Sequence, residues 1–143
     1  TVVWRMLMAW LKKAAKFGSQ SIVASLDVKK NLFGSYGVYK FSGRKRVKAD
    51  PLSFIEELIE AGIGEIFLNS IERDGTYKGY DLELIKRIAS KVEVPVIACG
   101  GASKREDFES AIQAGADAVA AGSLFVYRGR TKGIMINYFN LSS

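Results

Sequence analysis

Short apolar runs along the chain alternate with segments whose apolar residues recur at helical spacing. Four runs have the composition of strands buried on both faces of a sheet: residues 21–27, 65–69, 94–98 and 116–121. Helices are predicted at 4–17, 50–62, 82–88 and 103–113, and a short one from Gly122 to Val126. This alternation is typical of a parallel sheet with crossover helices, so the predicted fold class is α/β.

Four strand–loop–helix units are half of the eight that close a (β/α)8 barrel, which needs about 250 residues. The chain has 143 residues. We therefore expect one domain, 1–143, that forms a half-barrel of the TIM-barrel family. An unclosed sheet leaves two edges and one face uncovered, so it should pair with a missing first half-barrel or with itself. Residues 1–16 predict an atypical leading helix, and 129–143 a tail with no strong period.

Two local patterns refine the segments between these strands. Residues 28–48 predict a small hairpin, because glycines separate short runs of aromatic and basic residues. Asp50-Pro51 has the chemistry of a helix start, with an N-cap side chain followed by proline at the first helical position.

The amino-acid composition excludes several classes of function. The net charge is +6, but the basic residues are spread out, so we expect phosphorylated small molecules as ligands and no nucleic acid. The chain has no His, which excludes a Ser-His-Asp catalytic triad and a His-ligated zinc site. We expect no metal and no cofactor. The single Cys99 excludes an internal disulfide and suits the cytoplasm. No apolar run is long enough to span a membrane.

Candidate functional residues lie where predicted strands end, the edge at which βα folds place their chemistry. Asp27 is predicted to end the first strand, and Asp74, Gly75 and Thr76 lie in the loop 71–81 after the second. Two carboxylates in different environments can divide acid and base roles, so Asp27 and Asp74 are candidates for proton transfer.

The last two predicted strands end in glycine-rich pairs, Gly100-Gly101 and Gly122-Ser123. Backbone N–H groups approach an anion closely where side chains are absent, and a short helix adds a favourable dipole. We interpret the two pairs as one phosphate cradle. Cys99 has no cation beside it in the sequence, which favours a pocket-wall thiol over a nucleophile.

Several motifs together resemble the cyclase subunit of imidazole glycerol phosphate synthase. They are Phe17–Gln20, Ile22–Lys29, Gly64–Ile66, Arg73–Thr76, Gly79–Asp81, Cys99–Ala102 and Ala114–Ala118. The resemblance covers about residues 17–127 and corresponds to strands five to eight of that barrel. It implies a lyase of histidine biosynthesis that takes ammonia from a glutaminase partner. Its substrate would be a bis-phosphorylated ribulosyl aminoimidazole nucleotide.

The resemblance also implies roles for single residues. Asp27 matches the family's second catalytic aspartate, and Asp74, with Gly75 and Thr76, matches the substrate-contacting part of the sixth loop. The four cradle residues match one of two phosphate sites: Gly100, Gly101, Gly122 and Ser123. Glu65 matches a charged residue at the bottom of the barrel, where ammonia enters.

Departures from the family pattern leave alternatives open. The first catalytic aspartate and the second phosphate site have no counterpart, so this chain alone is expected to be inactive. Glu72 stands where the family usually has Asp. Asn69, Cys99 and the segments 127–130 and 136–138 look more like a paralogue that supplies ammonia for sugar amidation in surface-polysaccharide synthesis. A third possibility is a non-catalytic half-barrel that binds phosphate.

Overall fold

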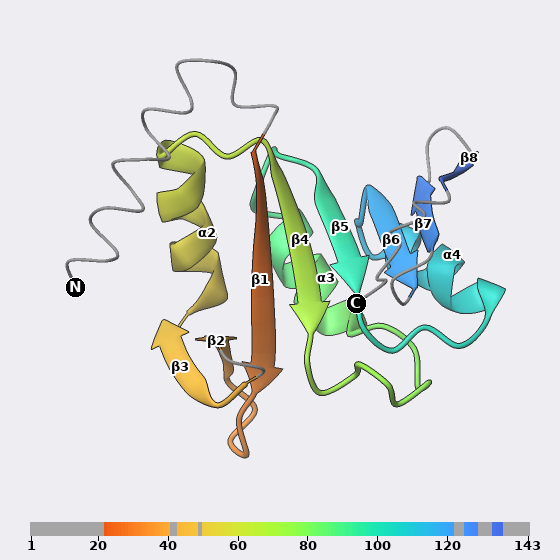
Figure 1. The fold of residues 1–143 in the computed structure, drawn as a ribbon, viewed down its shortest axis with the longest axis horizontal. Helices are drawn as coiled ribbons and strands as arrows, with labels where there is room; N and C mark the ends of the chain where they lie inside the picture. The colour runs from red at the N-terminus through yellow and green to blue at the C-terminus, as the bar shows by residue number, and fades with distance from the viewer. Residues whose placement is uncertain (1–21, 41–42, 49, 122–124, 129–132, 136–143) are drawn as a thin grey trace, which may run out of the picture.

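The protein forms one open sheet with helices on one face (Figure 1). The computed structural model describes residues 22–40, 43–48, 50–121, 125–128 and 133–135. Within them the strand order is β3-β2-β1-β4-β5-β6-β7-β8. The strands are β1 (Val23–Lys30), β2 (Tyr36–Lys40), β3 (Lys45–Lys48), β4 (Glu65–Ser70), β5 (Val96–Cys99), β6 (Ala118–Ala121), β7 (Phe125–Arg128) and β8 (Gly133–Met135).

The four central strands are parallel, and the outer ones are antiparallel. Strands β1, β4, β5 and β6 pair in parallel, in the order in which they follow one another along the chain. The hairpin β2–β3 extends the sheet from β1, and β7–β8 extends it from β6. The predicted α/β class and four-unit half-barrel are confirmed, because the four predicted strands form the parallel centre of a sheet that does not close.

Three described helices cover one face of this sheet: α2 (Pro51–Glu60), α3 (Leu82–Ala89) and α4 (Arg105–Gln113). The predicted start of α2 is confirmed, since the Asp50 side chain accepts a hydrogen bond from Ser53 N at 3.0 Å and Pro51 follows. Alternate sheet residues pack on these helices in the main core: Leu26, Val28, Ile66, Leu68 and Val96. None of the described helices is long and apolar enough to cross a membrane.

The intervening sheet residues point to the other face, which carries no helix among the described residues. Strand register places Asp27, Asn69 and Cys99 side by side across β1, β4 and β5, and Ser25 and Phe67 form the row below. The core-facing neighbours are buried, whereas Asp27, Asn69 and Cys99 are half-buried. In a closed barrel this helix-free face is the interior, so the open sheet presents half of a barrel interior.

Two sequence predictions about strand ends are wrong. The predicted short helix from Gly122 to Val126 is overturned at its end, because Phe125 and Val126 belong to β7, which pairs antiparallel with β6. Its aromatic and β-branched residues pair with the strand edge that β6 would otherwise leave open. Asp27 does not end its strand: β1 continues to Lys30, because its last residues also pair with β2. The predicted leading helix lies outside the described residues.

Candidate functional site

Asp27 lies on the helix-free face, near the carboxyl ends of the parallel strands. The Asn69 side-chain amide donates a hydrogen bond from Nδ2 to Asp27 Oδ1 at 2.9 Å. These two residues are register partners on β1 and β4, and Cys99 is the partner of Asn69 on β5. A carboxylate, an amide and a thiol therefore stand in one row at the rim of the sheet.

The loop 71–81 brings Asp74 to the same rim. Its backbone is folded onto the end of β4, because Asp74 N donates to Ser70 O at 3.0 Å and Thr76 Oγ1 donates to Arg73 O at 2.7 Å. Burial raises the pKa of the Cys99 thiol to about 11, and the negative charges of Asp74 and Asp27 raise it further. Both carboxylates are thus close enough to Cys99 to disfavour its thiolate. The two predicted acids therefore lie at the same rim.

Cys99 should react slowly with alkylating agents at neutral pH. Only the thiolate is nucleophilic, so the alkylation rate of the folded chain by iodoacetamide should rise with a midpoint near pH 11. In denaturant the midpoint should fall to about 8.5. Asp74→Asn should lower the pH midpoint of alkylation in the folded chain, because it removes a negative charge that acts on Cys99. Glu72→Gln, in the same loop, should leave that midpoint unchanged. A folded wild-type midpoint near the denatured value would contradict this arrangement.

Gly100 and Gly101 are glycines for a reason that the sequence does not reveal. Both have positive φ, 97° and 103°, and a Cβ at Gly101 would lie 2.2 Å from Gly79 O. Gly79 N in turn donates to Gly101 O at 2.7 Å. The close approach of loop 71–81 therefore requires glycine at position 101, whether or not an anion binds. Gly122 and Ser123 lie outside the described residues, so the phosphate cradle stays a prediction.

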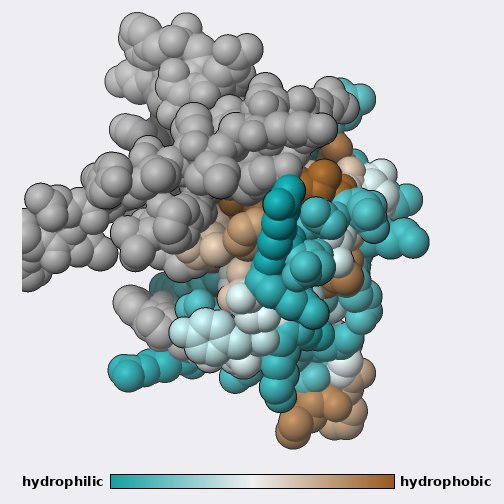
Figure 2. Space-filling model, turned by 90° about the vertical axis from the view of Figure 1, so that its right-hand side faces the viewer, coloured by the Kyte–Doolittle hydropathy of each residue, from teal (hydrophilic) through white to brown (hydrophobic). Residues whose placement is uncertain are grey.

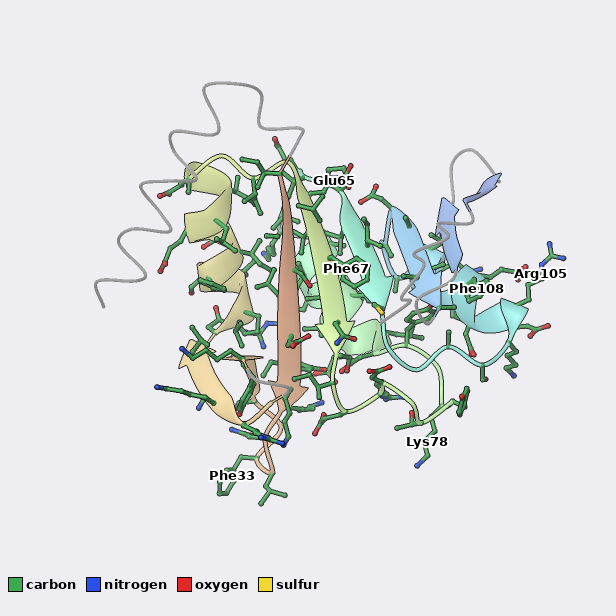
Figure 3. The ribbon with its side chains drawn as sticks, viewed as in Figure 1. Phe33, Glu65, Phe67, Lys78, Arg105 and Phe108 are labelled. Carbon is green, nitrogen blue, oxygen red and sulfur yellow. The ribbon has the colours of Figure 1, made fainter. Side chains whose placement is uncertain are left out.

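Glu65 lies far from this rim. It is the first residue of β4, and Figure 3 shows it at the opposite end of the strand from the loop that carries Lys78. Its side chain is half-buried, on the same face as Phe67 and Asn69. This position agrees with a place at the bottom of a barrel interior, while its role in ammonia entry stays a prediction.

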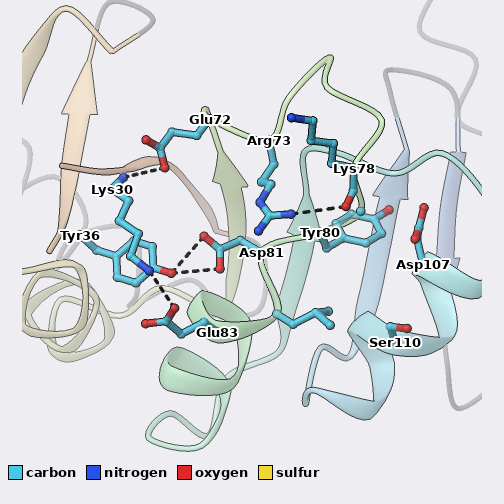
Figure 4. Close-up of a pocket in the computed structure, with 12 residues that line it drawn as sticks. Lys30, Tyr36, Glu72, Arg73, Lys78, Tyr80, Asp81, Glu83, Asp107 and Ser110 are labelled. Carbon is cyan, nitrogen blue, oxygen red and sulfur yellow. Dashed lines mark hydrogen bonds and ion pairs between the residues drawn. The ribbon is translucent and has the colours of Figure 1, made fainter. Parts of the chain in front are cut away.

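Sequence reasoning missed a pocket of about 330 Å³ on the outer side of the loop (Figure 4). Its lining includes Lys30, Tyr36, Arg73, Asp81 and Glu83. The Tyr36 hydroxyl donates to the buried Asp81 carboxylate at 3.0 Å, and Asp81 also caps α3 by accepting from Leu84 N at 3.0 Å. Burial, and then the Asp81 charge, raise the pKa of Tyr36. Asp81 thus joins the β2 strand to the start of α3.

The remaining polar contacts in this pocket also hold its walls together. Lys30 Nζ forms an ion pair with Glu83 at 2.8 Å. The Tyr80 hydroxyl donates to Ala120 O on β6 at 2.8 Å, and burial raises its pKa. The sequence signal for this network was the motif Gly79–Asp81 before an apolar helix. The structure shows that it anchors the loop between β2 and β6.

A hydrophobic projection lies at the end of the β1–β2 hairpin. Figure 2 shows it at the lower end of the molecule, and the exposed side chains there are Leu32 and Phe33. The turn has a defined shape, because Asn31 Oδ1 accepts from Phe33 N and Ser35 N, both at 2.9 Å. This tip stands on the same edge of the sheet as the rim.

Comparison with known proteins gives a consistent result. The family model described as histidine biosynthesis protein matches residues 6–132. The imidazole glycerol phosphate synthase subunit HisF of Pyrobaculum aerophilum is 52% identical over 116 residues, 80% of this chain and 45% of the relative. The subunit of the same name from Alkaliphilus metalliredigens is 46% identical over 115 residues, 80% of this chain and 46% of the relative. The chain spans about half the length of the curated relatives it matches.

Proposed function

Because the chain belongs to the histidine biosynthesis protein family, we propose that it is the carboxyl-terminal half of a cyclase barrel. The whole barrel would act as the cyclase subunit of imidazole glycerol phosphate synthase. One observation carries the proposal: Asp27 on β1 and Asp74 in the loop folded onto the end of β4 come from two different units and both lie at the rim formed by the carboxyl ends of parallel strands. In barrel enzymes this rim is where the chemistry takes place.

In the proposed reaction, ammonia attacks the bis-phosphorylated ribulosyl aminoimidazole nucleotide. The products are imidazole glycerol phosphate and an aminoimidazole carboxamide nucleotide. Asp27 would transfer a proton at the reacting centre, because its carboxylate is on the helix-free face. Asp74, Gly75 and Thr76 would contact and orient the substrate.

Two further roles complete this proposal. Gly100, Gly101, Gly122 and Ser123 would hold one phosphate through backbone N–H groups. Ammonia would come from a glutaminase subunit and enter past Glu65, at the opposite end of the barrel interior. The single cysteine and the biosynthetic family both favour a cytoplasmic enzyme.

The proposed enzyme needs a second half-barrel. The described sheet is open and its helix-free face carries half of a barrel interior, while the first catalytic aspartate of the family has no counterpart in this sequence. The partner would be a first half-barrel, or a second copy of this chain. With one acid missing, this chain alone should show negligible cyclase turnover.

The proposal is tested by assembling the chain with a first half-barrel and measuring ammonia-dependent turnover of the nucleotide. The upstream coding sequence is the first thing to inspect, since an Asp at the end of its first strand would supply the missing acid. Formation of imidazole glycerol phosphate by the assembly, and by neither half alone, is expected. Robust turnover by the chain alone, or none by the assembly, would contradict the proposal.

A second candidate function rests on the row formed by Asp27, Asn69 and Cys99 at the rim of the sheet. Asn69 lies directly beside Asp27, and Cys99 lies beside Asn69 in the same row; these two residues favour the sugar-amidation paralogue. The same assembly would then supply ammonia to an enzyme that amidates a sugar, and that acceptor should be tried in parallel with the nucleotide. A non-catalytic phosphate-binding half-barrel predicts instead that phosphate raises the melting temperature of the chain and that no product forms with either acceptor.

A further inference from the structure

The two polar ends of the Asn69 side chain have very different surroundings. Its Nδ2 donates to Asp27 Oδ1 at 2.9 Å, across two strands whose residues are 42 positions apart in the sequence. Its Oδ1 is buried and has no hydrogen-bond partner among the described residues. A carboxylate can only accept, so the amide nitrogen must face Asp27 and the oxygen must point away from it.

The oxygen end of Asn69 lies against Gly100. A Cβ built on Gly100 would approach Asn69 Oδ1 to 3.1 Å and Ser70 O to 2.6 Å. The absence of a side chain at Gly100 therefore gives the amide room to keep its orientation. A buried oxygen without a partner destabilises a fold, so this arrangement is unfavourable for stability taken alone. Unfavourable local arrangements of this kind are characteristic of functional sites.

We propose that Asn69 is the positioning residue of Asp27. Its amide holds one carboxylate oxygen toward β4, which leaves the other oxygen on the helix-free face, where a substrate would bind. Asn69 would not touch the substrate itself. This inference rests on the proposed function for its catalytic consequence, but the positioning is a property of this chain that can be measured without turnover.

The direct test is the side-chain conformation of Asp27 in the 143-residue chain. Three-bond NMR couplings between Hα and the two Hβ protons of Asp27 report whether χ1 occupies one staggered rotamer or several. One rotamer is expected in the wild type, and averaged couplings are expected in Asn69→Leu, which keeps the branched skeleton without polar atoms. Asn69→Ala, which removes the amide without placing a second carboxyl group beside Asp27, should also release Asp27, and it carries the test if Asn69→Leu fails to fold.

Phe67→Leu is the matched control, because Phe67 lies on the same strand and face, one row below Asn69. It should leave the Asp27 couplings unchanged. The proposal is overturned if Asp27 already averages between rotamers in the wild type. It is equally overturned if the couplings stay fixed in both Asn69 variants.

Kinetics of the assembled barrel separate this inference from the proposed function. Asn69→Leu should lower kcat by about 100-fold with little change in KM, since small misplacements of a reacting group have effects of this size. In an Asp27→Asn background it should cause no further loss, because the two residues act as one unit. Full turnover by Asp27→Asn would refute the proposed role of Asp27, whereas loss with Asp27→Asn but not with Asn69→Leu would refute the positioning role.

Discussion

Replacing Asp27 by Asn should lower ammonia-dependent turnover of the assembled barrel by about 10²- to 10⁴-fold, the usual contribution of a general acid or base. An amide has the shape of the carboxylate but cannot take up and return a proton. Its Oδ1 can still accept from Asn69 Nδ2, which now donates to Asp27 at 2.9 Å, so the fold should persist. The measurement is kcat of the assembly with saturating ammonium and nucleotide.

Ser25→Ala is the control for this variant. Ser25 is exposed on the same strand and face as Asp27, one row further from the rim, and it should tolerate the change without loss of turnover. Circular dichroism and the melting temperature should be the same for both variants and the wild type. If Asp27→Asn retained wild-type kcat, Asp27 would not be the proton-transfer group.

Gly101→Ala should be the most destabilising small substitution on the rim. Its φ of 103° is one that L-residues rarely adopt, and the added Cβ would lie 2.2 Å from the backbone oxygen of Gly79. Overpacking costs about 1–3 kcal/mol and a left-handed alanine about 1–2 kcal/mol. We expect the free energy of unfolding to fall by about 2–5 kcal/mol, measured by urea denaturation of the chain.

Gly75→Ala isolates the backbone part of this effect. Gly75 also has a positive φ, 72°, but nothing lies within 4 Å of a Cβ built on it. Its substitution should therefore cost only the conformational part, about 1–2 kcal/mol. Equal destabilisation by the two variants would mean that the loop moves away from Gly101 at no cost, and that the close approach to Gly79 does not hold the rim together.

Much of this fold could be predicted because its signals are local. The apolar runs of β1, β4, β5 and β6 predicted buried parallel strands, and Asp50-Pro51 predicted the start of α2. Each of these depends on residues within a few positions of one another. The resemblance to the histidine biosynthesis family, drawn from motifs along residues 17–127, is confirmed by the family model and by the relatives.

The errors arose where pairing with the neighbouring antiparallel strand decides the local conformation. The pair Gly122-Ser123 suggested a helix start, but pairing with β6 places Phe125 and Val126 in a strand. Asp27 was expected to end its strand, yet pairing of β1 with β2 extends that strand to Lys30. Hydrogen bonds to a neighbouring strand outweigh the weak preferences of three or four residues.

The amino-acid sequence by itself determined the residue types available for chemistry: two acids near the carboxyl ends of neighbouring strands, glycine pairs, no histidine and one cysteine. Only the tertiary structure decided which residues contact one another. It placed Asn69 against Asp27, set Gly101 against Gly79, and joined Tyr36 to Asp81 across 45 positions. The physical reason is that strand register and loop packing bring together residues far apart in the sequence, and no local pattern records that approach.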